Sequence, residues 1–229
     1  MKIKKIVIFG CGVAAGIATK YIQSDKKDEI CAYTADAKYM SGQKFMGLPL
    51  VAFEDVEKKY PPEDYLMFIP LGYNGMNHLR AEKYRFAKKK GYTLYSYVSS
   101  KSFLHQEVNC GENCFILEGQ AINFEVKIGN NVVLWSANHV GDRTTIGDHV
   151  WLSSHVTIAG DAVIKDYCFL GIHATISNHV VLEEETFVGA ACFITKNTKK
   201  GEVYMQPGSK PHSDDSLTFL KILQASNKL

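Results

Sequence analysis

A period of six residues runs through the second half of the chain. Aliphatic side chains occupy every sixth position from Leu104 to Ile194, with Cys110 as the one substitute, and no insertion interrupts the run. The fourth residue after each of these positions is usually small or β-branched, as at Val132 and Thr144. An α-helix cannot keep a period of six on one face, and a simple strand repeats every two residues. The pattern therefore predicts a parallel β-helix in which each hexad forms one side of a coil.

This repeat resembles that of the hexapeptide-repeat, left-handed β-helix acyltransferases, and the resemblance covers residues 104 to 205. Three hexads make one coil in that family. The resemblance therefore implies that residues three hexads apart stack in columns, with a spacing of about 4.8 Å. Every side chain of the repeat can then be assigned to a column.

The first hundred residues lack the period of six and instead show a pattern of alternating strands and helices. KKIVIFGCGVAAGIATKYI predicts a strand, a glycine turn and a helix, EICAYTAD predicts a second strand ending at Asp36, and EDYLMFIPLGYN predicts a third. A helix is expected over residues 76–90, and YTLYSYV predicts one further strand. Alternating strands and helices favour a small parallel sheet whose ligand crevice lies at the carboxyl ends of the strands.

The expected fold class is thus α/β joined to all-β, in three units. Residues 1–99 are expected to form a small Rossmann-like nucleotide-binding domain, residues 104–205 the left-handed β-helix, and residues 206–229 a C-terminal tail. Within the tail, DSLTFLKILQ predicts a short amphipathic helix capped by Ser213 or Asp214.

Charge and hydropathy narrow the choice of partners. The 26 lysines and arginines nearly balance the 24 acidic residues, and the dense basic runs at 88–90 and 199–200 are short, so no nucleic-acid partner is expected. No apolar stretch is long enough to span a bilayer. The N-terminus is similar to a signal peptide, but Gly10 and Gly12 interrupt its apolar run and the strand and helix pattern continues. We therefore expect a cytoplasmic protein with no membrane partner.

Cysteines and most histidines fit the repeat without chemistry. Four cysteines take inward positions and are expected to be apolar fillers rather than zinc ligands: Cys110, Cys114, Cys168 and Cys192. Four histidines fall three residues after an aliphatic position, where the coil turns, and are expected to be exposed: His149, His155, His173 and His179. No metal is expected.

Asn138 and His139 are not explained by the repeat. Asn138 takes an inward slot that elsewhere holds a small apolar residue, and a buried amide needs hydrogen-bond partners. Gln120 lies one coil below in the same column, so the two amides are expected to form a ladder or to fix the backbone that carries His139. His139 points outward and is a candidate general base. The alternative is a histidine at a subunit interface.

Asp142 begins an informative column. The column continues through Gly160 and Asn178 to Lys196, so a long thin ligand could lie along it with an anionic end near Lys196 or Lys199. A second, nearly bare column, taken as its neighbour, is formed by Ser153, Gly171 and Gly189, where backbone amides can approach a ligand.

Candidate nucleotide ligands lie in the N-terminal unit. Gly10 and Gly12 form a partial dinucleotide fingerprint, but the unit is short, so a mononucleotide fits better. The stretch LGYNGMNHLRAEKY places phosphate-binding candidates at the end of a strand and the start of a helix: Gly72, Tyr73, Asn77 and Arg80.

The whole arrangement resembles the bacterial nucleotide-sugar acetyltransferases of surface glycan biosynthesis, which include bacillosamine and perosamine N-acetyltransferases and sialic acid O-acetyltransferases. FGCG, GYNGMNHLR and LWSANHVG with TIGDHVWLSSHVTIAG carry the resemblance. It implies a homotrimer in which acetyl-CoA lies between subunits. The implied nucleotide-sugar ligands are Gly10, Gly12, Asp36, Gly72, Tyr73, Asn77 and Arg80, and the implied acetyl-CoA ligands are Trp151, Gly160, Asn178, Ala190, Lys196 and Lys199.

The chain departs from that family at the general base. Many relatives carry a histidine two residues after the anchor that is Val140 here, and this chain has Asp142 followed by Arg143. Three alternatives follow: His139 is the base and Asp142 orients it, Asp142 is the base, or no strong base exists. Pairing with Arg143 would keep Asp142 ionised. An amine needs less help than a hydroxyl, so the departure favours N-acetylation over sugar O-acetylation. A non-catalytic trimeric binding protein is the third possibility.

Overall fold

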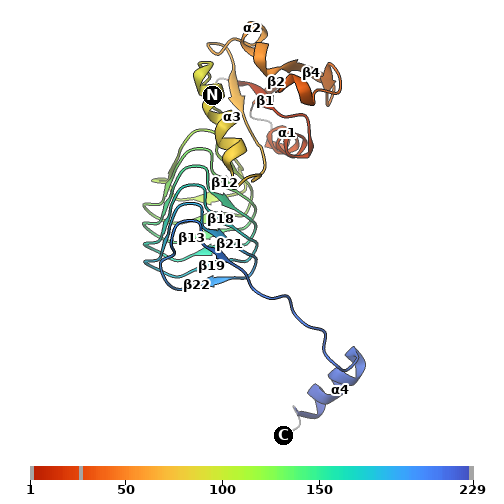
Figure 1. Cartoon of the computed structure of the whole chain (residues 1–229), viewed down its shortest axis with the longest axis vertical. Helices are drawn as coiled ribbons and strands as arrows, with labels where there is room; N and C mark the ends of the chain where they lie inside the picture. The colour runs from red at the N-terminus through yellow and green to blue at the C-terminus, as the bar shows by residue number, and fades with distance from the viewer. Residues whose placement is uncertain (1–2, 26–27, 227–229) are drawn as a thin grey trace.

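The structure is a computed structural model that describes residues 3–25 and 28–226. An N-terminal α/β unit sits on one end of a tall coil of short strands, and a C-terminal segment leaves the other end (Figure 1). None of the helices within the described residues is long and apolar enough to cross a membrane.

The N-terminal sheet is mixed, whereas a wholly parallel sheet was expected. Its strand order is β3 (Lys44–Phe45), β4 (Leu48–Ala52), β2 (Glu29–Ala35), β1 (Lys5–Phe9) and β5 (Leu66–Phe68). All neighbours are parallel except β3, which forms an antiparallel hairpin with β4. The helical elements are α1 (Val13–Asp25), η1 (Ala37–Tyr39), η2 (Phe53–Asp55), α2 (Val56–Lys59) and α3 (His78–Lys89).

The stretch expected to form a last strand of this sheet is divided between the two units. Leu94 makes a single parallel bridge to Met67 on β5. Two residues later the chain has left the sheet, and β6 (Tyr97–Val98) pairs with the β-helix strand β9 (Phe115–Ile116). The β-helix therefore begins before the first hexad recognised in the sequence.

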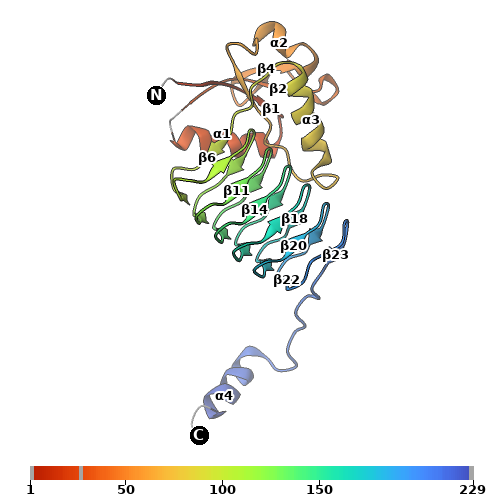
Figure 2. The same cartoon turned by 90° about the vertical axis from the view of Figure 1, so that its left-hand side faces the viewer.

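Three parallel sheets of two-residue strands make up the β-helix, as the period of six predicts (Figure 2). The first face contains β7 (Phe103–Leu104), β10 (Ala121–Ile122), β13 (His139–Val140), β16 (Thr157–Ile158), β19 (Thr175–Ile176) and β22 (Phe193–Ile194). The second face contains β8 (Asn109–Cys110), β11 (Lys127–Ile128), β14 (Thr145–Ile146), β17 (Val163–Ile164) and β20 (Val181–Leu182). The third face contains β6, β9, β12 (Val133–Leu134), β15 (Trp151–Leu152), β18 (Phe169–Leu170), β21 (Phe187–Val188) and β23 (Val203–Tyr204).

Register confirms the columns. Val140 pairs with Ile122 in the preceding coil and with Ile158 in the next, so residues three hexads apart lie directly over one another. The anchors form one continuous apolar core, in which Cys114, Cys168 and Cys192 are buried and Cys110 is packed at the edge. The four cysteines are therefore fillers, as the repeat predicted.

Close stacking of the coils demands glycine at Gly141. A Cβ atom there would lie 2.5 Å from the backbone nitrogen of Gly160 in the next coil. Two residues after Gly141 the chain turns through the left-handed region, where Arg143 has a φ of 58°. Asp161, the equivalent residue of the next coil, has a φ of 59°. Gly141 thus sets the corner at which Asp142 is presented.

The third face of the β-helix carries the N-terminal unit. Phe115, Trp151 and Phe169 project from it into an apolar cluster that also contains Ala15 and Ile22 of α1. The two units therefore share a core, which fixes the sheet and its carboxyl ends relative to the coils.

The tail contains the expected short helix, α4 (Ser216–Ser226). Asp215 caps it, because its Oδ1 accepts hydrogen bonds from the backbone N–H groups of Leu217 (2.9 Å) and Thr218 (3.1 Å). The expected caps, Ser213 and Asp214, lie before the helix and do not take this role.

Candidate functional site

A cavity of about 560 Å³ opens at the carboxyl ends of β1 and β2. It brings together Gly10, Gly12 and Asp36, three of the candidate nucleotide ligands, with Asn74 from the loop after β5. This is the crevice position at which α/β sheets bind ligands. A φ of 114° at Gly10 lets the chain turn sharply from β1 toward α1.

Lys83 of α3 is a cavity residue that sequence reasoning missed. Its ammonium group donates hydrogen bonds to both carboxylate oxygens of Asp36, each at 2.7 Å. Both side chains are largely buried, and the ion pair lies on the cavity wall. No sequence signal separates Lys83 from Lys88 and Lys89 on the same helix.

Gly72 and Tyr73 line a different cavity. This second, almost wholly apolar space of about 330 Å³ lies between the N-terminus of α1 and the third face of the β-helix. Trp135 and Trp151 form its β-helix side, and Leu71 lies between it and the first cavity because it lines both. The two cavities are thus neighbours along the loop that follows β5.

Arg80 does not face either cavity, contrary to the phosphate-binding role expected for it. Its side chain is fully buried, and its guanidinium donates to the carbonyl oxygens of Gly72, Asn131 and His149 at 3.1–3.3 Å. Burial lowers the pKa of Arg80 to about 9. Arg80 therefore joins the N-terminal unit to the β-helix turns, and its donors are occupied.

Asn77 is corrected in the same way, and Trp151 also lies where the two units meet. Asn77 is fully buried and donates to the backbone oxygen of Tyr167 at 3.2 Å. Trp151, expected to contact acetyl-CoA, packs under the guanidinium of Arg80 at 5.5 Å and against the ring of Tyr73 at 5.1 Å. Trp151 thus lies at the contact between the two units and also lines the apolar cavity, and its contact with acetyl-CoA stays a prediction.

His149 is buried, although its turn position predicted exposure. Its Nδ1 accepts a hydrogen bond from the Asn131 side-chain amide at 2.8 Å, and its ring packs on Tyr84 and Tyr167. Burial lowers the pKa of His149 to about 4, so the ring is neutral near pH 7. By contrast, His155 and His173 are exposed turn residues with stacked rings, as expected.

Asn138 fixes the coil that carries His139. Its Oδ1 accepts a hydrogen bond from the backbone N–H of Val156 in the next coil at 2.7 Å, and its Nδ2 donates to the carbonyl of Trp135. Gln120 donates to the same carbonyl at 2.6 Å, so the two amides share an acceptor instead of bonding to each other. The backbone-fixing alternative therefore describes Asn138 better than an amide ladder.

His139 and Asp142 occupy one coil of the first face and the corner that follows it. His139 is exposed and points outward from β13, and Asp142 is half-buried with an Oδ1 atom that is fully covered and has no hydrogen-bond partner. No hydrogen bond joins the two side chains among the residues that the structure describes. The expected Arg143 pair is also different, because Arg143 donates to both oxygens of Asp161 at 2.7 and 2.8 Å.

The expected acetyl-CoA ligands lie at different corners. Gly160, Asn178 and Lys196 continue the Asp142 column, between the first and second faces, and their coils carry exposed side chains at Asn178 and Lys196. Ala190 follows the third face, as do Ser153, Gly171 and Gly189. The bare column is therefore not beside the Asp142 column of its own chain, and one chain does not form the expected groove.

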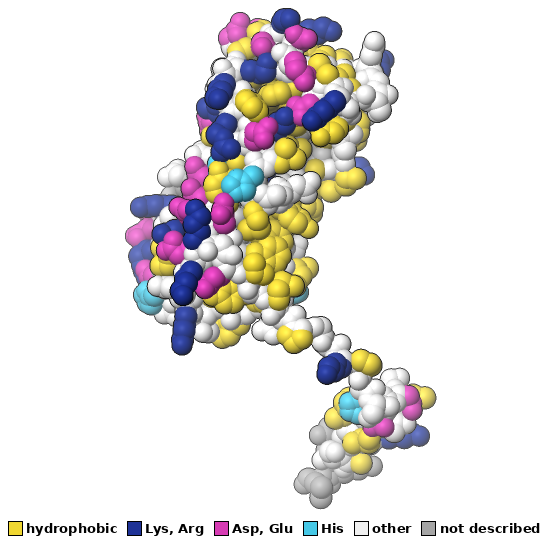
Figure 3. Space-filling view, in the orientation of Figure 1, with side chains coloured by type: hydrophobic (Ala, Val, Ile, Leu, Met, Phe, Trp, Pro, Cys, Tyr) yellow, Lys and Arg dark blue, Asp and Glu magenta, His cyan; other side chains and the backbone are white. Residues whose placement is uncertain are grey.

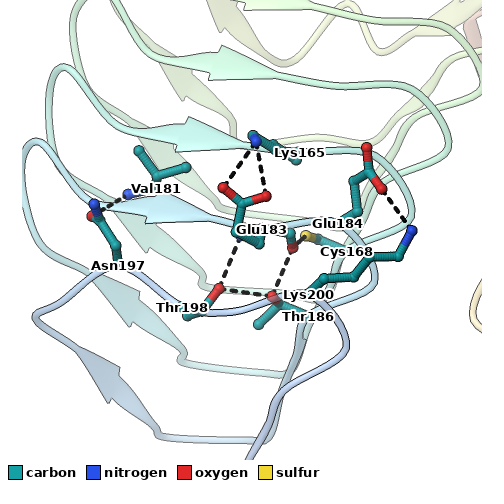
Figure 4. A network of polar contacts seen from close by, with 9 residues as sticks. All are labelled: Lys165, Cys168, Val181, Glu183, Glu184, Thr186, Asn197, Thr198 and Lys200. Carbon is teal, nitrogen blue, oxygen red and sulfur yellow. Dashed lines mark hydrogen bonds and ion pairs between the residues drawn. The ribbon is translucent and has the colours of Figure 1, made fainter.

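Lys199 lies beyond the last strand of the first face, next to a polar network. Lys199 is exposed, its N–H donates to Glu202 at 2.8 Å, and the next residue, Lys200, pairs with Glu184 (Figure 4). No group of three or more histidine, cysteine or acidic side chains suited to a metal ion occurs within the described part of the chain.

Comparison with known proteins identifies this architecture. No protein-family model and no curated protein matches the sequence. Among solved structures, a mutant of perosamine N-acetyltransferase from Caulobacter crescentus, in complex with CoA and GDP-perosamine, shares 21% sequence identity with a TM-score of 0.77, covering 88% of this chain and 93% of that one.

Two further structures match over similar lengths. The acetyltransferase domain of PglB from Neisseria gonorrhoeae FA1090 shares 14% identity with a TM-score of 0.76, covering 87% of this chain and 95% of that one. WeeI from Acinetobacter baumannii AYE shares 19% identity with a TM-score of 0.75, over 87% and 95%. The resemblance drawn from the sequence is confirmed at the level of architecture: this chain has the fold of the hexapeptide-repeat nucleotide-sugar N-acetyltransferases.

Proposed function

We propose that this protein is an acetyl-CoA-dependent N-acetyltransferase that acts on the amino group of a nucleotide-linked sugar. The observation that carries the proposal is the cavity at the carboxyl ends of β1 and β2, placed on a β-helix of the same architecture as the enzymes solved with CoA and GDP-perosamine. The expected setting is the cytoplasm, in the synthesis of a bacterial surface glycan.

The first cavity is the proposed nucleotide site. Asp36 accepts a hydrogen bond from a hydroxyl of the nucleotide, while the backbone N–H groups that follow Gly12 lie at the start of α1, where a diphosphate is stabilised. The adjoining apolar cavity, which shares Leu71, receives the sugar. Arg80 supports this region from behind by fixing the Gly72 carbonyl, and it does not touch the ligand.

Asp142 is the proposed partner of the reacting amine. Its carboxylate is not neutralised by Arg143, which is held by Asp161. The neutral amine attacks the thioester carbonyl of acetyl-CoA, the C–S bond breaks, CoA leaves as a thiolate, and the nitrogen loses one proton, which finally protonates the CoA sulfur. Asp142 attracts the ammonium form of the sugar and takes that proton, with His139 on the same coil as the alternative acceptor.

Two chains are needed to complete the site. The lining of the nucleotide cavity contains no residue of the β-helix, and the Asp142 and Ser153 columns lie at different corners of one chain. A homotrimer, in which the Asp142 corner of one subunit faces the third face of its neighbour, brings these parts together. Acetyl-CoA then lies between subunits along Asp142, Gly160, Asn178 and Lys196, with Ala190 and Lys199 near its end.

The test follows thiol release from acetyl-CoA with UDP-, dTDP- and GDP-linked amino sugars. Each amino sugar is paired with the sugar that carries a hydroxyl in place of the amine. We expect release with an amino sugar and none with its hydroxyl counterpart. Release with the hydroxyl sugars alone would indicate an O-acetyltransferase, and release with no sugar, despite nucleotide binding, would indicate a binding protein.

A further inference from the structure

The C-terminal helix α4 makes no contact that buries it within one chain. It lies beyond the last coil, away from the β-helix, in both views of the molecule (Figures 1 and 2). None of its described residues is buried, and its five large apolar side chains are 38% to 70% exposed: Leu217, Phe219, Leu220, Ile222 and Leu223. A well-capped helix with this surface needs a partner.

The apolar side chains cover most of the helix surface. At 3.6 residues per turn they span an arc of about 220°. The remaining strip holds Thr218, Lys221 and Ala225, which follow one another at spacings of three and four residues. A single flat surface would cover a narrower arc, so this helix is suited to pack between two neighbours.

α4 does not cover the last coil of its own β-helix. The open edge of β20 is already closed by the chain itself, since Asn197 Oδ1 accepts from the N–H of Val181 and the N–H of Thr198 donates to the Val181 carbonyl. Thr198 is buried and bonds to the N–H of Glu183 and the hydroxyl of Thr186 (Figure 4). The edge of β20 is therefore covered without α4.

The segment that carries α4 directs it away from its own coils. Residues 205–215 are all exposed and lack regular structure, and they include Pro207 and Pro211. Proline restricts φ and favours extended backbone, so the segment acts as a spacer. The apolar surface that Figure 3 shows on the lower coils is thus not covered by α4 of the same chain.

The charge of this region does not suit an anionic membrane surface. Lys221 is the one basic residue of α4, and Asp214 and Asp215 precede it, which leaves residues 214–226 with one positive and two negative charges. Helices that lie on membranes carry a basic polar face. Packing against a second copy of the same chain requires no basic face, and that copy presents the same apolar helix.

We infer that α4 packs against α4 of other copies of this chain, forming a bundle at the end of the assembly opposite the N-terminal units. The inference rests on the proposed trimer, whose threefold axis would bring three parallel tails out of the same end. The bundle would hold the β-helices together at the end where the C-terminal segments leave, and it would not contact the nucleotide cavities at the opposite end.

The test uses the full-length chain and an amine-reactive cross-linker, analysed by mass spectrometry. A link between Lys221 and Lys221 can form only between copies. We expect this link in the wild type, its loss in a Leu220→Asp and Leu223→Asp double variant, and its retention in Ala225→Asp, which adds the same residue to the polar strip. In sedimentation the dissociation constant of the assembly should rise at least ten-fold in the double variant, and that of Ala225→Asp should resemble the wild-type value.

The outcomes separate this inference from the proposed function. A trimer that lacks the Lys221 link, or whose Lys221 links only to lysines of its own coils, overturns the bundle and leaves the trimeric site standing. Co-sedimentation with phosphatidylglycerol vesicles in place of the link also overturns it. A chain that is monomeric at every concentration overturns both.

Discussion

Lys83 and Asp36 form an ion pair on the wall of the proposed nucleotide cavity, with both carboxylate oxygens 2.7 Å from the ammonium nitrogen. Asp36 directly follows the last residue of β2, and Lys83 reaches it from α3. The pair fixes the carboxylate in one orientation, with its remaining lone pairs available to a ligand. Lys83 is thus a positioning residue for the proposed nucleotide site.

Asp36→Asn is expected to weaken nucleotide-sugar binding about ten-fold, because one strong acceptor and its ion pair are lost. Lys83→Met should weaken binding to a smaller extent by freeing the carboxylate. Isothermal titration with a nucleoside diphosphate measures both. Lys88→Met, on an exposed part of α3, is the control. Equal affinity in Asp36→Asn and wild type would remove Asp36 from the site.

Arg80→Met is expected to lower the free energy of unfolding by about 3–5 kcal/mol, because the buried carbonyls of Asn131, His149 and Gly72 would lose their donor. Arg85→Met is the matched control, since Arg85 is exposed and its guanidinium donates a hydrogen bond to the Tyr167 hydroxyl at 3.0 Å. Its effect should stay within about 0.5 kcal/mol. Urea unfolding measures the difference, and a similar midpoint for both variants would contradict the structural role of Arg80.

The repeat could be predicted from the sequence because each hexad depends on local spacing. Val140 and Ile158 take equivalent places in successive coils, and the same rule placed Asp142 at a corner. Arg80 could not be placed in this way. Its acceptors lie 51 and 69 residues away, and an arginine on a short helix has the same sequence pattern whether it meets phosphate or a β-helix turn.

The same limit applies to His149 and the tail. The turn position of His149 was correct, but its burial arises from Tyr84 of α3, which packs on it from the other unit. Conversely, the amphipathic pattern of α4 was recognisable, yet no pattern could show that none of its described residues is buried within its own chain. Local periodicity predicts the helices and strands, whereas contacts between the units of the chain decide which side chains are buried.

Gly141→Ala is expected to destabilise the β-helix by about 1–3 kcal/mol, because its new Cβ atom would meet the backbone of Gly160 and Ala159 rather than a movable side chain. Gly42→Ala is the control, since nothing lies within 4 Å of a Cβ atom there. Thermal and urea unfolding report the two changes. A loss of thiol release in Gly141→Ala with unchanged stability would instead indicate a direct role in catalysis.

Substitution of the candidate bases should separate their roles. Asp142→Asn is expected to lower kcat by about 100-fold if Asp142 takes the proton, within the usual range for a general base. His139→Asn should then change kcat less than five-fold, roughly. Thiol release across pH 6 to 9, at saturating acetyl-CoA, measures both rates. The reverse order of effects would assign the proton to His139, and two nearly active variants would mean that neither residue is the base.

The buried ring of His149 makes the stability of the fold depend on pH. Its pKa is about 4 in the folded chain, below the ordinary value of 6.5, so between these values the unfolded chain binds a proton that the folded chain does not. Stability is therefore full above pH 6.5 and falls as the pH drops toward 4. From pH 7 to pH 4.5 the wild type should lose roughly 2 kcal/mol more than His149→Asn, as the pKa difference implies.

Urea unfolding at the two pH values measures that loss. The exposed His155 supplies the control, because His155→Asn should keep the pH dependence of the wild type. Acidic groups contribute to the slope in all three proteins alike, so the comparison isolates the imidazole. If His149→Asn and the wild type lose the same free energy on acidification, the ring is not held neutral by burial between Tyr84 and Tyr167.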